Sequence, residues 1–292
     1  MRLYTIQVNG EEKVAVGYKE TDGLYLLESF GLSARDMNDL ILRMNAETFA
    51  RLQQPPAGAA ALSLKQAALC APIPRPRQDV VCLGLNYFDH AAEAARFSGE
   101  AFGGEKPVTI YFSKRVNEAV APGGTIPAYE GLVDSLDYES ELGVIIGKDA
   151  KNVSANEAFD YIFGYTVIND VSARNLQTRH KQWYLGKSLD GFTPMGPCIV
   201  TADEIGVPEL KIESYVNGEP RQCSNTNLLM KSIPGMIEEL SAGITLQAGT
   251  IIATGTPAGV GMGRKPPVFL KPGDTVECRI EKIGSLINVV GR

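Results

Sequence analysis

LDYESELGVIIG, residues 136–147, places two glutamates directly before an apolar run of strand length. Glu139 and Glu141 are two positions apart, so in a strand both side chains project from the same face. The apolar residues that follow predict that this strand enters a core. Two carboxylates beside a core repel each other and lose hydration, and a divalent cation is the common remedy. On spacing alone, a solvated edge strand whose glutamates face water is an equal alternative.

The sequence on both sides of this strand is rich in further segments of strand length and poor in helices. Strands are predicted at 79–87, 108–114, 159–170, 197–205, 210–218, 249–255 and 274–290, with a turn before a last strand that begins at Gly284. Helices are predicted at 89–96, 155–160, 174–182 and 227–240. Because strands and helices do not alternate regularly, a doubly wound fold or a TIM barrel is disfavoured. The pattern predicts a strand-rich α+β fold.

The first 73 residues have a different organisation. Three strand-like runs, RLYTIQV, KVAVGY and GLYLLE, are separated by turn signals, and residues 33–54 switch to helical spacing. Three prolines within residues 72–76 cannot continue a helix or pair in a central strand. We therefore predict a small N-terminal accessory domain over 1–73 and a catalytic domain over 74–292.

The overall composition disfavours several classes of protein. The chain has 28 Lys and Arg against 34 Asp and Glu, a net charge of −6, so nucleic acid is not an expected partner. No apolar run approaches the roughly 18 residues that cross a bilayer, and the N-terminus does not resemble a signal peptide, so no membrane association is expected. The five cysteines are scattered and form no CxxC, which predicts a reduced, cytoplasmic protein with Cys82 and Cys198 as buried thiols.

A third candidate carboxylate follows another apolar run. Asp170 ends the stretch YIFGYTVIND, and with Glu139 and Glu141 it offers three oxygen donors with no cysteine or histidine close in sequence. Oxygen donors of this kind favour a hard ion over zinc. The sequence therefore predicts a Mg²⁺ or Mn²⁺ site.

Histidine and lysine supply the candidate acid–base groups. His90 and Glu93 are three residues apart, so on a helix they share a face, where the carboxylate orients the imidazole and makes it a general base. A capping box, in which Glu93 bonds back to the start of its helix, is an equal alternative. Lys187 lies between apolar residues and a Pro/Gly-rich turn and can stabilise an oxyanion if it is desolvated, although most lysines are solvated. His180 is expected at the surface.

In their order along the chain, five stretches resemble the fumarylacetoacetate hydrolase family, in particular its bacterial two-domain members. They are GLNYFDHAAE (84–93), LDYESELGVIIG (136–147), NDVSARNLQ (169–177), QWYLGKSLDGFTPMGP (182–197) and TGTPAGVG (254–261). The resemblance covers essentially all of residues 77–292. It implies a mixed β-sandwich or β-roll catalytic domain, a small N-terminal domain and a homodimer.

The resemblance also implies roles for individual residues. It places the metal ligands at Glu139, Glu141 and Asp170, a water-activating dyad on a lid over 88–106 at His90 and Glu93, and a catalytic lysine at Lys187. It places the contacts to the 2-oxo-carboxylate of a substrate at Arg174, Gln177 and Thr256. Two positions, Asn175 and Thr193, depart from the family pattern, in which Asp and Cys are common there. Neither is an implied metal ligand, so the departures concern the polarity of the pocket.

The implied function is a Mg²⁺- or Mn²⁺-dependent hydrolase that cleaves a C–C bond in a 2,4-dioxo acid, of the acylpyruvate or fumarylpyruvate type, via a metal-bound enolate. Glu93 would orient His90, His90 would deprotonate the attacking water, and Lys187 would stabilise the oxyanion. Oxaloacetate decarboxylation, or isomerisation and hydration of 2-oxo acids, use the same enolate and stay open as alternatives. A non-catalytic metal-binding protein is a remote alternative, because all three catalytic residues are present.

Overall fold

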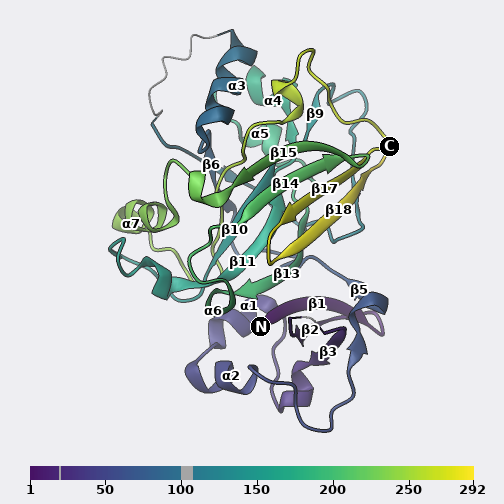
Figure 1. Cartoon of the computed structure of the whole chain (residues 1–292), viewed down its shortest axis with the longest axis vertical. Coiled ribbons are helices and arrows are strands. Elements are labelled where there is room, and N and C mark those ends of the chain that lie inside the picture. The colour runs from purple at the N-terminus through teal and green to yellow at the C-terminus, as the bar shows by residue number, and fades with distance from the viewer. Residues whose placement is uncertain (20, 100–107) are drawn as a thin grey trace.

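One long mixed sheet of eleven described strands runs from the N-terminal region through the centre of the molecule (Figure 1). The structure is a computed structural model that describes residues 1–19, 21–99 and 108–292. Neighbouring strands of this sheet are antiparallel except β16 and β6, which pair in parallel. The strand order is β4 (Leu62–Ser63), β3 (Gly23–Leu26), β2 (Glu11–Gly17), β1 (Arg2–Val8), β13 (Met195–Thr201), β11 (Ile162–Asn169), β10 (Ser140–Ile146), β16 (Ile251–Ala253), β6 (Val80–Gly84) and β7 (Ile110–Lys114), with β5 (Ala68–Leu69) paired to β1.

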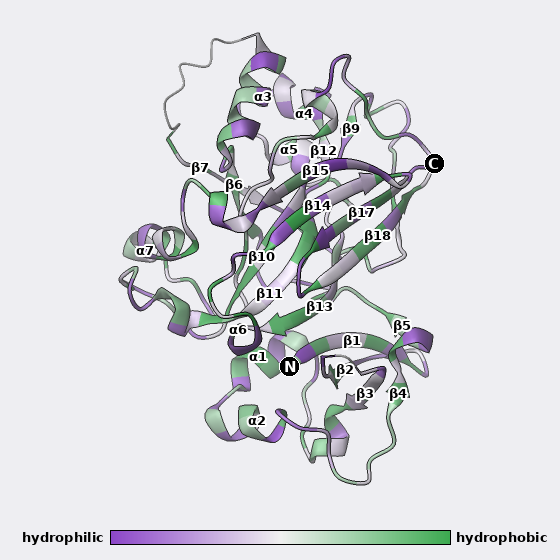
Figure 2. Cartoon of the chain, in the orientation of Figure 1, coloured by the Kyte–Doolittle hydropathy of each residue, from purple (hydrophilic) through white to green (hydrophobic). Residues whose placement is uncertain are grey.

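A second sheet packs against the centre of the first. Alternate residues of its strands β14 and β17 are buried, whereas every residue of β10 and β11 is buried because both faces of those strands are covered. Figure 2 shows the neighbouring β13 as hydrophobic. These observations confirm the predicted strand-rich architecture. The second sheet has the order β15 (Glu219–Asn225), β14 (Lys211–Val216), β17 (Thr275–Ile280), β18 (Gly284–Val290) and β8 (Thr125–Ile126), and β12 (Ser172–Ala173) pairs separately with β9 (Leu136–Asp137).

The described helices are short and lie around the sheets. The α-helices are α1 (Met37–Arg43), α2 (Ala46–Arg51), α3 (Phe88–Ser98), α4 (Arg174–Arg179), α5 (Tyr184–Lys187), α6 (Ala202–Ile205) and α7 (Ile233–Gly243). The 3₁₀ helices are η1 (Leu27–Phe30), η2 (Leu64–Gln66), η3 (Ala158–Tyr161), η4 (Thr226–Leu228) and η5 (Gly261–Gly263). None of these helices is long and apolar enough to span a bilayer.

Three predicted elements are interrupted, the first of which is the helix predicted over 227–240, which is divided into η4 and α7. The helix predicted over 33–54 is two helices, because the side chain of Asn45 accepts a hydrogen bond from the backbone N–H of Thr48 and caps a new helix there. The strand predicted over 197–205 ends at Thr201, after which the residues Ala202–Ile205 form α6. These differences concern local boundaries of helices and strands and leave the sheet order unaffected.

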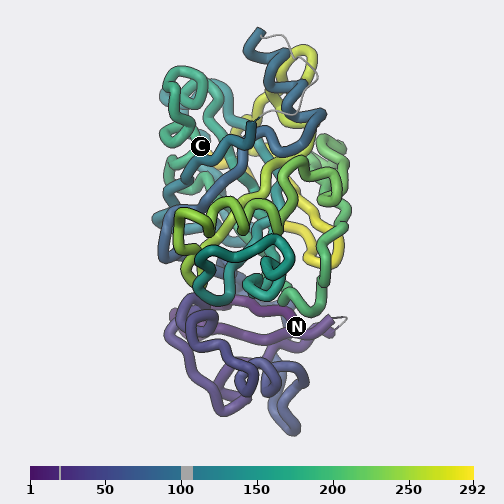
Figure 3. Tube along the Cα trace, turned by 90° about the vertical axis from the view of Figure 1, so that its left-hand side faces the viewer, coloured from purple at the N-terminus to yellow at the C-terminus, as the bar shows by residue number. Residues whose placement is uncertain are grey.

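The N-terminal region shares its sheet and part of its core with the rest of the chain. β1 pairs with β13, with Arg2 opposite Val200 and Leu3 opposite Ile199. One hydrophobic cluster contains Leu3 and Met37 together with Ile199. Figure 3 shows this region (purple) at the end of the molecule opposite α3. The division at residue 73 stays a prediction.

The segment that carries the predicted dyad begins with a regular helix. α3 covers Phe88–Ser98 and ends at Gly99, whose φ of 73° is left-handed. The lid was predicted over 88–106, and its residues 100–106 lie outside the described part of the chain. The lid therefore stays a prediction.

Candidate active site

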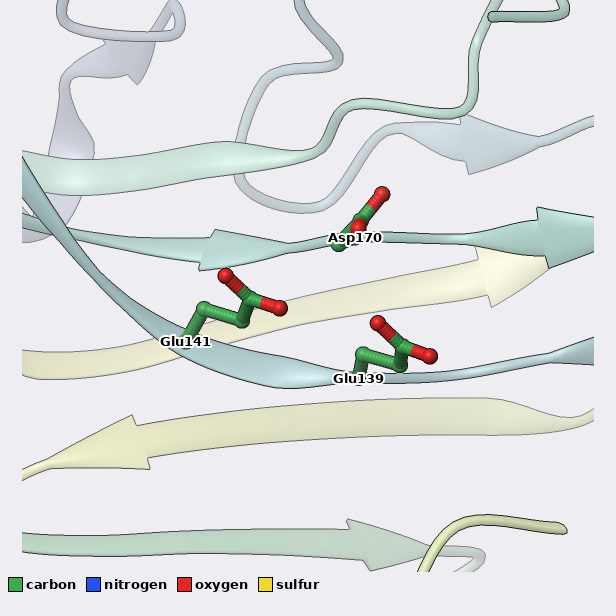
Figure 4. A group of neighbouring side chains, drawn as sticks. All are labelled: Glu139, Glu141 and Asp170. Carbon is green, nitrogen blue, oxygen red and sulfur yellow. The ribbon is translucent and has the colours of Figure 1, made fainter. Parts of the chain in front are cut away.

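Three carboxylates meet where β10 begins and β11 ends. Glu139 lies between β9 and β10, Glu141 lies in β10, and Asp170 directly follows β11. The antiparallel pairing of β10 with β11 brings these ends together, and the N–H of Asp170 donates to the carbonyl oxygen of Glu139 over 2.9 Å. One carboxylate oxygen of each residue lies within 4.8 Å of the other two, and all three side chains are buried (Figure 4). The solvated-edge alternative for Glu139 and Glu141 is therefore wrong.

Three buried cations surround these carboxylates. Nζ of Lys187 lies 2.7 Å from Oε2 of Glu139 and 2.7 Å from Oδ2 of Asp170. Nζ of Lys114 lies 2.6 Å from the other oxygen of Asp170. The guanidinium group of Arg174 lies 2.7 Å from Oε1 of Glu139. Each oxygen of Glu139 and Asp170 therefore faces a positive charge.

Glu141 differs from the other two carboxylates, because no cation of the described residues forms an ion pair with it. Burial, followed by the charges of Asp170 and Glu139, raises the pKa of Glu141 well above its ordinary value. Burial also opposes ionisation of Glu139, but the charges of Lys187 and Arg174 outweigh it and hold the pKa of Glu139 below its usual range. The N–H of Gly255 donates to Oε2 of Glu141 over 2.8 Å. Glu141 is thus the group that an added cation would ionise.

The charges of this cluster leave room for a metal ion. Among the described residues, three buried bases face four buried acids, so full ionisation of the acids, Glu141 included, would leave one negative charge for an added cation to compensate. The acids are Asp137, Glu139, Glu141 and Asp170, and the bases are Lys114, Arg174 and Lys187. Three carboxylates form a hard oxygen donor set that suits Mg²⁺ or Mn²⁺. The residues present therefore fit a divalent cation held by Glu139, Glu141 and Asp170.

The structure also brings His90 and Glu93 together on α3. Nδ1 of His90 lies 3.5 Å from Oε2 of Glu93, and both side chains are buried. Both oxygens of Glu93 accept the N–H of Gly259, at 3.0 Å each. The capping-box alternative is therefore wrong, because the carboxylate of Glu93 bonds to a distant loop instead of the start of its own helix. This loop, which continues into η5, fixes the position of the dyad.

The predicted substrate-binding residues lie beside the carboxylates. Nη1 of Arg174 donates to Oε1 of Gln177 over 2.9 Å. The hydroxyl of Thr256 donates to the carbonyl oxygen of Ser140 over 2.9 Å. Arg174, Gln177 and Thr256 are all buried and line one cavity. Their contacts to a substrate stay a prediction.

A cavity of about 530 Å³ joins the carboxylates to α3. Among the predicted site residues, those lining it are His90, Glu139, Glu141, Arg174, Gln177, Lys187 and Thr256. This volume lies within the range of roughly 300–1,000 Å³ typical of small-molecule sites. His180 was expected only as a surface residue; it is exposed and also lines this cavity.

Two residues that the sequence did not single out complete the cluster. Lys114, at the end of β7, is fully buried and donates to Asp170 and to the carbonyl oxygen of Val171. Asp137 accepts the N–H groups of Gly261 and Met262 and the Nε–H of Arg174. Asp137 thus connects the loop that holds Glu93 to the arginine beside Glu139.

Comparison with known proteins identifies the family. The model of the fumarylacetoacetate (FAA) hydrolase C-terminal domain matches residues 79–291. The chain belongs to the fumarylacetoacetate hydrolase family. It is 47% identical over 230 residues to the oxaloacetate tautomerase YisK of Bacillus subtilis, covering 78% of this chain and 75% of that protein. The family resemblance inferred from the five sequence stretches is therefore confirmed.

Solved structures of this family share the whole fold. The fumarylacetoacetate hydrolase of Exiguobacterium antarcticum superposes with a TM-score of 0.84 at 35% identity, covering 100% of this chain and 99% of that one. The maleylpyruvate hydrolase of Sphingobium superposes with a TM-score of 0.75 at 29% identity, covering 100% and 99%. Fumarylacetoacetate hydrolase family members are enzymes, and so is this chain. They are metal-dependent and act on small organic acids, and the Glu139, Glu141 and Asp170 group can bind an ion.

Proposed function

We propose that this enzyme moves a proton at carbon 3 of a 2-oxo acid, with keto–enol tautomerisation of oxaloacetate as its first reaction. The observation that carries the proposal is that His90, which lies 3.5 Å from Glu93, lines the same cavity as Glu139 and Glu141 of the carboxylate group. The relative that is 47% identical is named an oxaloacetate tautomerase. Tautomerisation belongs to the isomerase alternative, and it moves ahead of C–C hydrolysis because of this relative.

Glu139, Glu141 and Asp170 would hold Mg²⁺ or Mn²⁺. When bound, such an ion polarises the 2-oxo group of a substrate and makes the hydrogens on carbon 3 more acidic. Arg174 and Gln177 would orient the carboxylate of the substrate. Lys187, whose Nζ lies between Glu139 and Asp170, would stabilise negative charge on the oxygen at carbon 2.

His90 is the group that would carry the proton. In the direction from enol to keto form, the proton on the carbon 2 oxygen leaves and carbon 3 gains a proton. Nδ1 of His90 is buried, has no hydrogen-bond partner among the residues that the structure describes, and lies 3.5 Å from Glu93. A small rotation of the imidazole would let Glu93 orient the ring and stabilise its protonated form. Burial of the pair would exclude bulk water from the transfer.

Hydrolysis of an acylpyruvate is the second candidate. It is favoured by the size of the cavity, about 530 Å³, which exceeds the needs of a four-carbon acid. The same His90 would then deprotonate a water molecule that attacks the carbonyl at carbon 4. The C3–C4 bond would break, the electron pair would pass to carbon 3, and the products would be a carboxylic acid and pyruvate.

The test follows the absorbance of enol-oxaloacetate with Mg²⁺ or Mn²⁺, and acylpyruvate loss in parallel. We expect E93Q to slow tautomerisation, while E47Q serves as the matched control because Glu47 is exposed on α2. If wild type and E93Q accelerate the decay of enol-oxaloacetate equally, the His90–Glu93 pair has no role in the reaction. Hydrolysis without tautomerisation would replace the first candidate by the second.

The remaining expectations from the sequence belong to the same proposal. We propose a cytoplasmic homodimer whose residues 1–73 form an accessory domain. The five cysteines are free, which suits a reducing compartment. Size-exclusion chromatography with light scattering measures the oligomeric state.

A further inference from the structure

The cavity has an uncharged part that the proposed proton transfer does not use. Within residues 1–19, 21–99 and 108–292, the ionisable residues that line the cavity belong to the carboxylate cluster or the dyad, except for His180. Much of the remaining wall is apolar and comes from α3, β7 and the residue before α5. We define the apolar wall as Ala94, Ala95, Phe97, Ile110, Phe112 and Trp183.

Phe112 marks the boundary between the charged part and the apolar wall. Nζ of Lys187 lies 5.3 Å from the centroid of the Phe112 ring. The indole ring of Trp183 lies 5.3 Å from the same ring, with the two planes 67° apart. A ligand held near Lys187 would therefore direct its far end along Phe112 to Trp183.

The position of the Trp183 side chain in this wall is fixed by its packing. A Cβ atom at position 84 would collide with the indole ring, so the glycine at the end of β6 makes room for it. The carbonyl oxygen of Trp183 accepts the N–H of Lys187 over 3.2 Å, which places both residues in one helical turn. The aromatic surface is thus preformed at a set distance from the charged part.

Among the described residues, the apolar wall offers no fixed positive charge to a second carboxylate. Arg174 and Lys187 lie in the charged part, where the proposed function assigns both to the 2-oxo-carboxylate end, and His180 lies exposed after the end of α4. An unpaired carboxylate against such a wall would lose hydration without a partner. A methylene group that is fully buried there would instead improve affinity about fourfold.

We propose that the apolar wall binds the substrate tail and selects 2-oxo acids with an uncharged, apolar tail over 2-oxo diacids of the same chain length. The inference rests on the proposed function, because the 2-oxo-carboxylate end must be held at the charged part. Trp183 is the specificity-determining residue. Oxaloacetate then uses the charged part alone.

The test measures binding to the full chain in Mg²⁺ by titration calorimetry, independently of turnover. The probes are pyruvate, 2-oxopentanoate and 2-oxohexanoate, with 2-oxoadipate as the diacid that carries a carboxylate where 2-oxohexanoate has a methyl group. We expect affinity to rise up to roughly 60-fold from pyruvate to 2-oxohexanoate, since three methylenes are added at about fourfold each. We expect 2-oxoadipate to bind at least tenfold more weakly than 2-oxohexanoate.

Trp183 itself provides a second readout, because it is the only tryptophan of the chain. 2-Oxohexanoate should change its emission and protect it from acrylamide, and pyruvate should not. In W183A the dependence on tail length should flatten, while pyruvate affinity stays within about twofold. G84A should also reduce the dependence of affinity on tail length, because the added Cβ displaces the indole ring. W183F should keep most of the preference for longer apolar tails. V207A is the control, because Val207 is exposed and does not line the cavity, and it should match the wild type.

Each outcome decides a separate point. The inference is overturned if pyruvate binds but affinity does not rise with tail length, or if 2-oxoadipate binds more tightly than 2-oxohexanoate. Either result leaves the proposed function standing. A rising series without oxaloacetate tautomerisation supports the inference and overturns the first candidate reaction. Failure of every 2-oxo acid to bind in Mg²⁺ and in Mn²⁺ overturns both.

Discussion

Replacing Glu141 with glutamine removes one charge from the carboxylate group and keeps the shape of the side chain. The ligand oxygens of the three residues lie within 4.8 Å of one another. Two unit charges at that distance repel by about 3.5 kcal/mol at an effective dielectric constant of roughly 20. Because burial and the charges of Asp170 and Glu139 raise the pKa of Glu141 well above its ordinary value, the metal-free site favours the neutral carboxyl form. An amide resembles that neutral group, so metal-free E141Q should be as stable as the wild type.

Metal binding should respond in the opposite way. We expect E141Q to lose at least about 100-fold in affinity, the upper end of the loss seen when only a supporting residue of a metal site is changed. At a metal concentration 100 times the dissociation constant of the wild type, metal binding raises the free energy of unfolding by about 2.7 kcal/mol in the wild type and by about 0.4 kcal/mol in E141Q. For a chain of this size, these gains correspond to a rise in Tm of roughly 5 °C and 1 °C.

The assay is thermal unfolding followed by circular dichroism, with and without Mn²⁺. E47Q is the matched control, because its glutamate side chain is 78% exposed and remote from the carboxylate group. The reasoning is refuted if E141Q keeps the full metal-dependent rise. It is also refuted if metal-free E141Q unfolds several degrees below the wild type, since the carboxylate would then have been stabilising.

Three further predictions follow from the same geometry. The raised pKa of Glu141 favours its neutral form in the metal-free protein, so the metal-free protein should lose stability as pH rises above the ordinary value of 4.5 towards the raised pKa. Metal binding should release protons and strengthen with pH, which calorimetry in buffers of different ionisation enthalpy measures, and zero proton release would contradict this prediction. H90A should lose tautomerase or hydrolase activity by roughly 10²–10⁴-fold while oxaloacetate decarboxylation falls less, and an equal loss of all activities in metal-loaded protein would count against His90 as the proton carrier. G263A places a Cβ in collision with the carboxylate of Glu93, so kcat should fall to that of E93Q while metal affinity stays unchanged. The control is G243A, whose added Cβ meets open space. A wild-type kcat in G263A would show that the position of Glu93 does not matter.

The sequence predicted the parts of the site that lie in compact local patterns. Glu139 and Glu141 share one short segment, and His90 and Glu93 share one helical turn, so their spacing already indicates a common face. The capping-box and edge-strand alternatives could be decided only by burial and by the contact from Glu93 to Gly259. That contact joins residues 166 positions apart, and no local pattern encodes it.

Lys114 and Asp137 show what local patterns miss. Lys114 ends a strand and in the sequence resembles a solvated lysine, because its partner Asp170 comes 56 residues later. Asp137 precedes the two glutamates, but its partners Gly261 and Met262 lie in a loop more than 120 residues away. A buried charge is recognisable only when the sheet order that covers it is known.

The same reason explains the fold boundaries. The N-terminal meander was recognisable from alternation and turn signals, and β1, β2 and β3 follow it closely. The pairing of β1 with β13, which extends the main sheet into this region, joins segments almost 200 residues apart. Periodicity identifies a strand but not its distant partner.

The location of the metal ion tests the central claim most directly. A crystal grown with Mn²⁺ and oxalate, with diffraction data collected near the manganese absorption edge, shows the ion as an anomalous peak. We predict one strong peak in each chain, within bonding distance of Glu139, Glu141 and Asp170, with oxalate on the side of Arg174 and Lys187. A peak elsewhere, or no peak at saturating Mn²⁺ with Glu139 and Asp170 still paired to Lys187, would contradict the account.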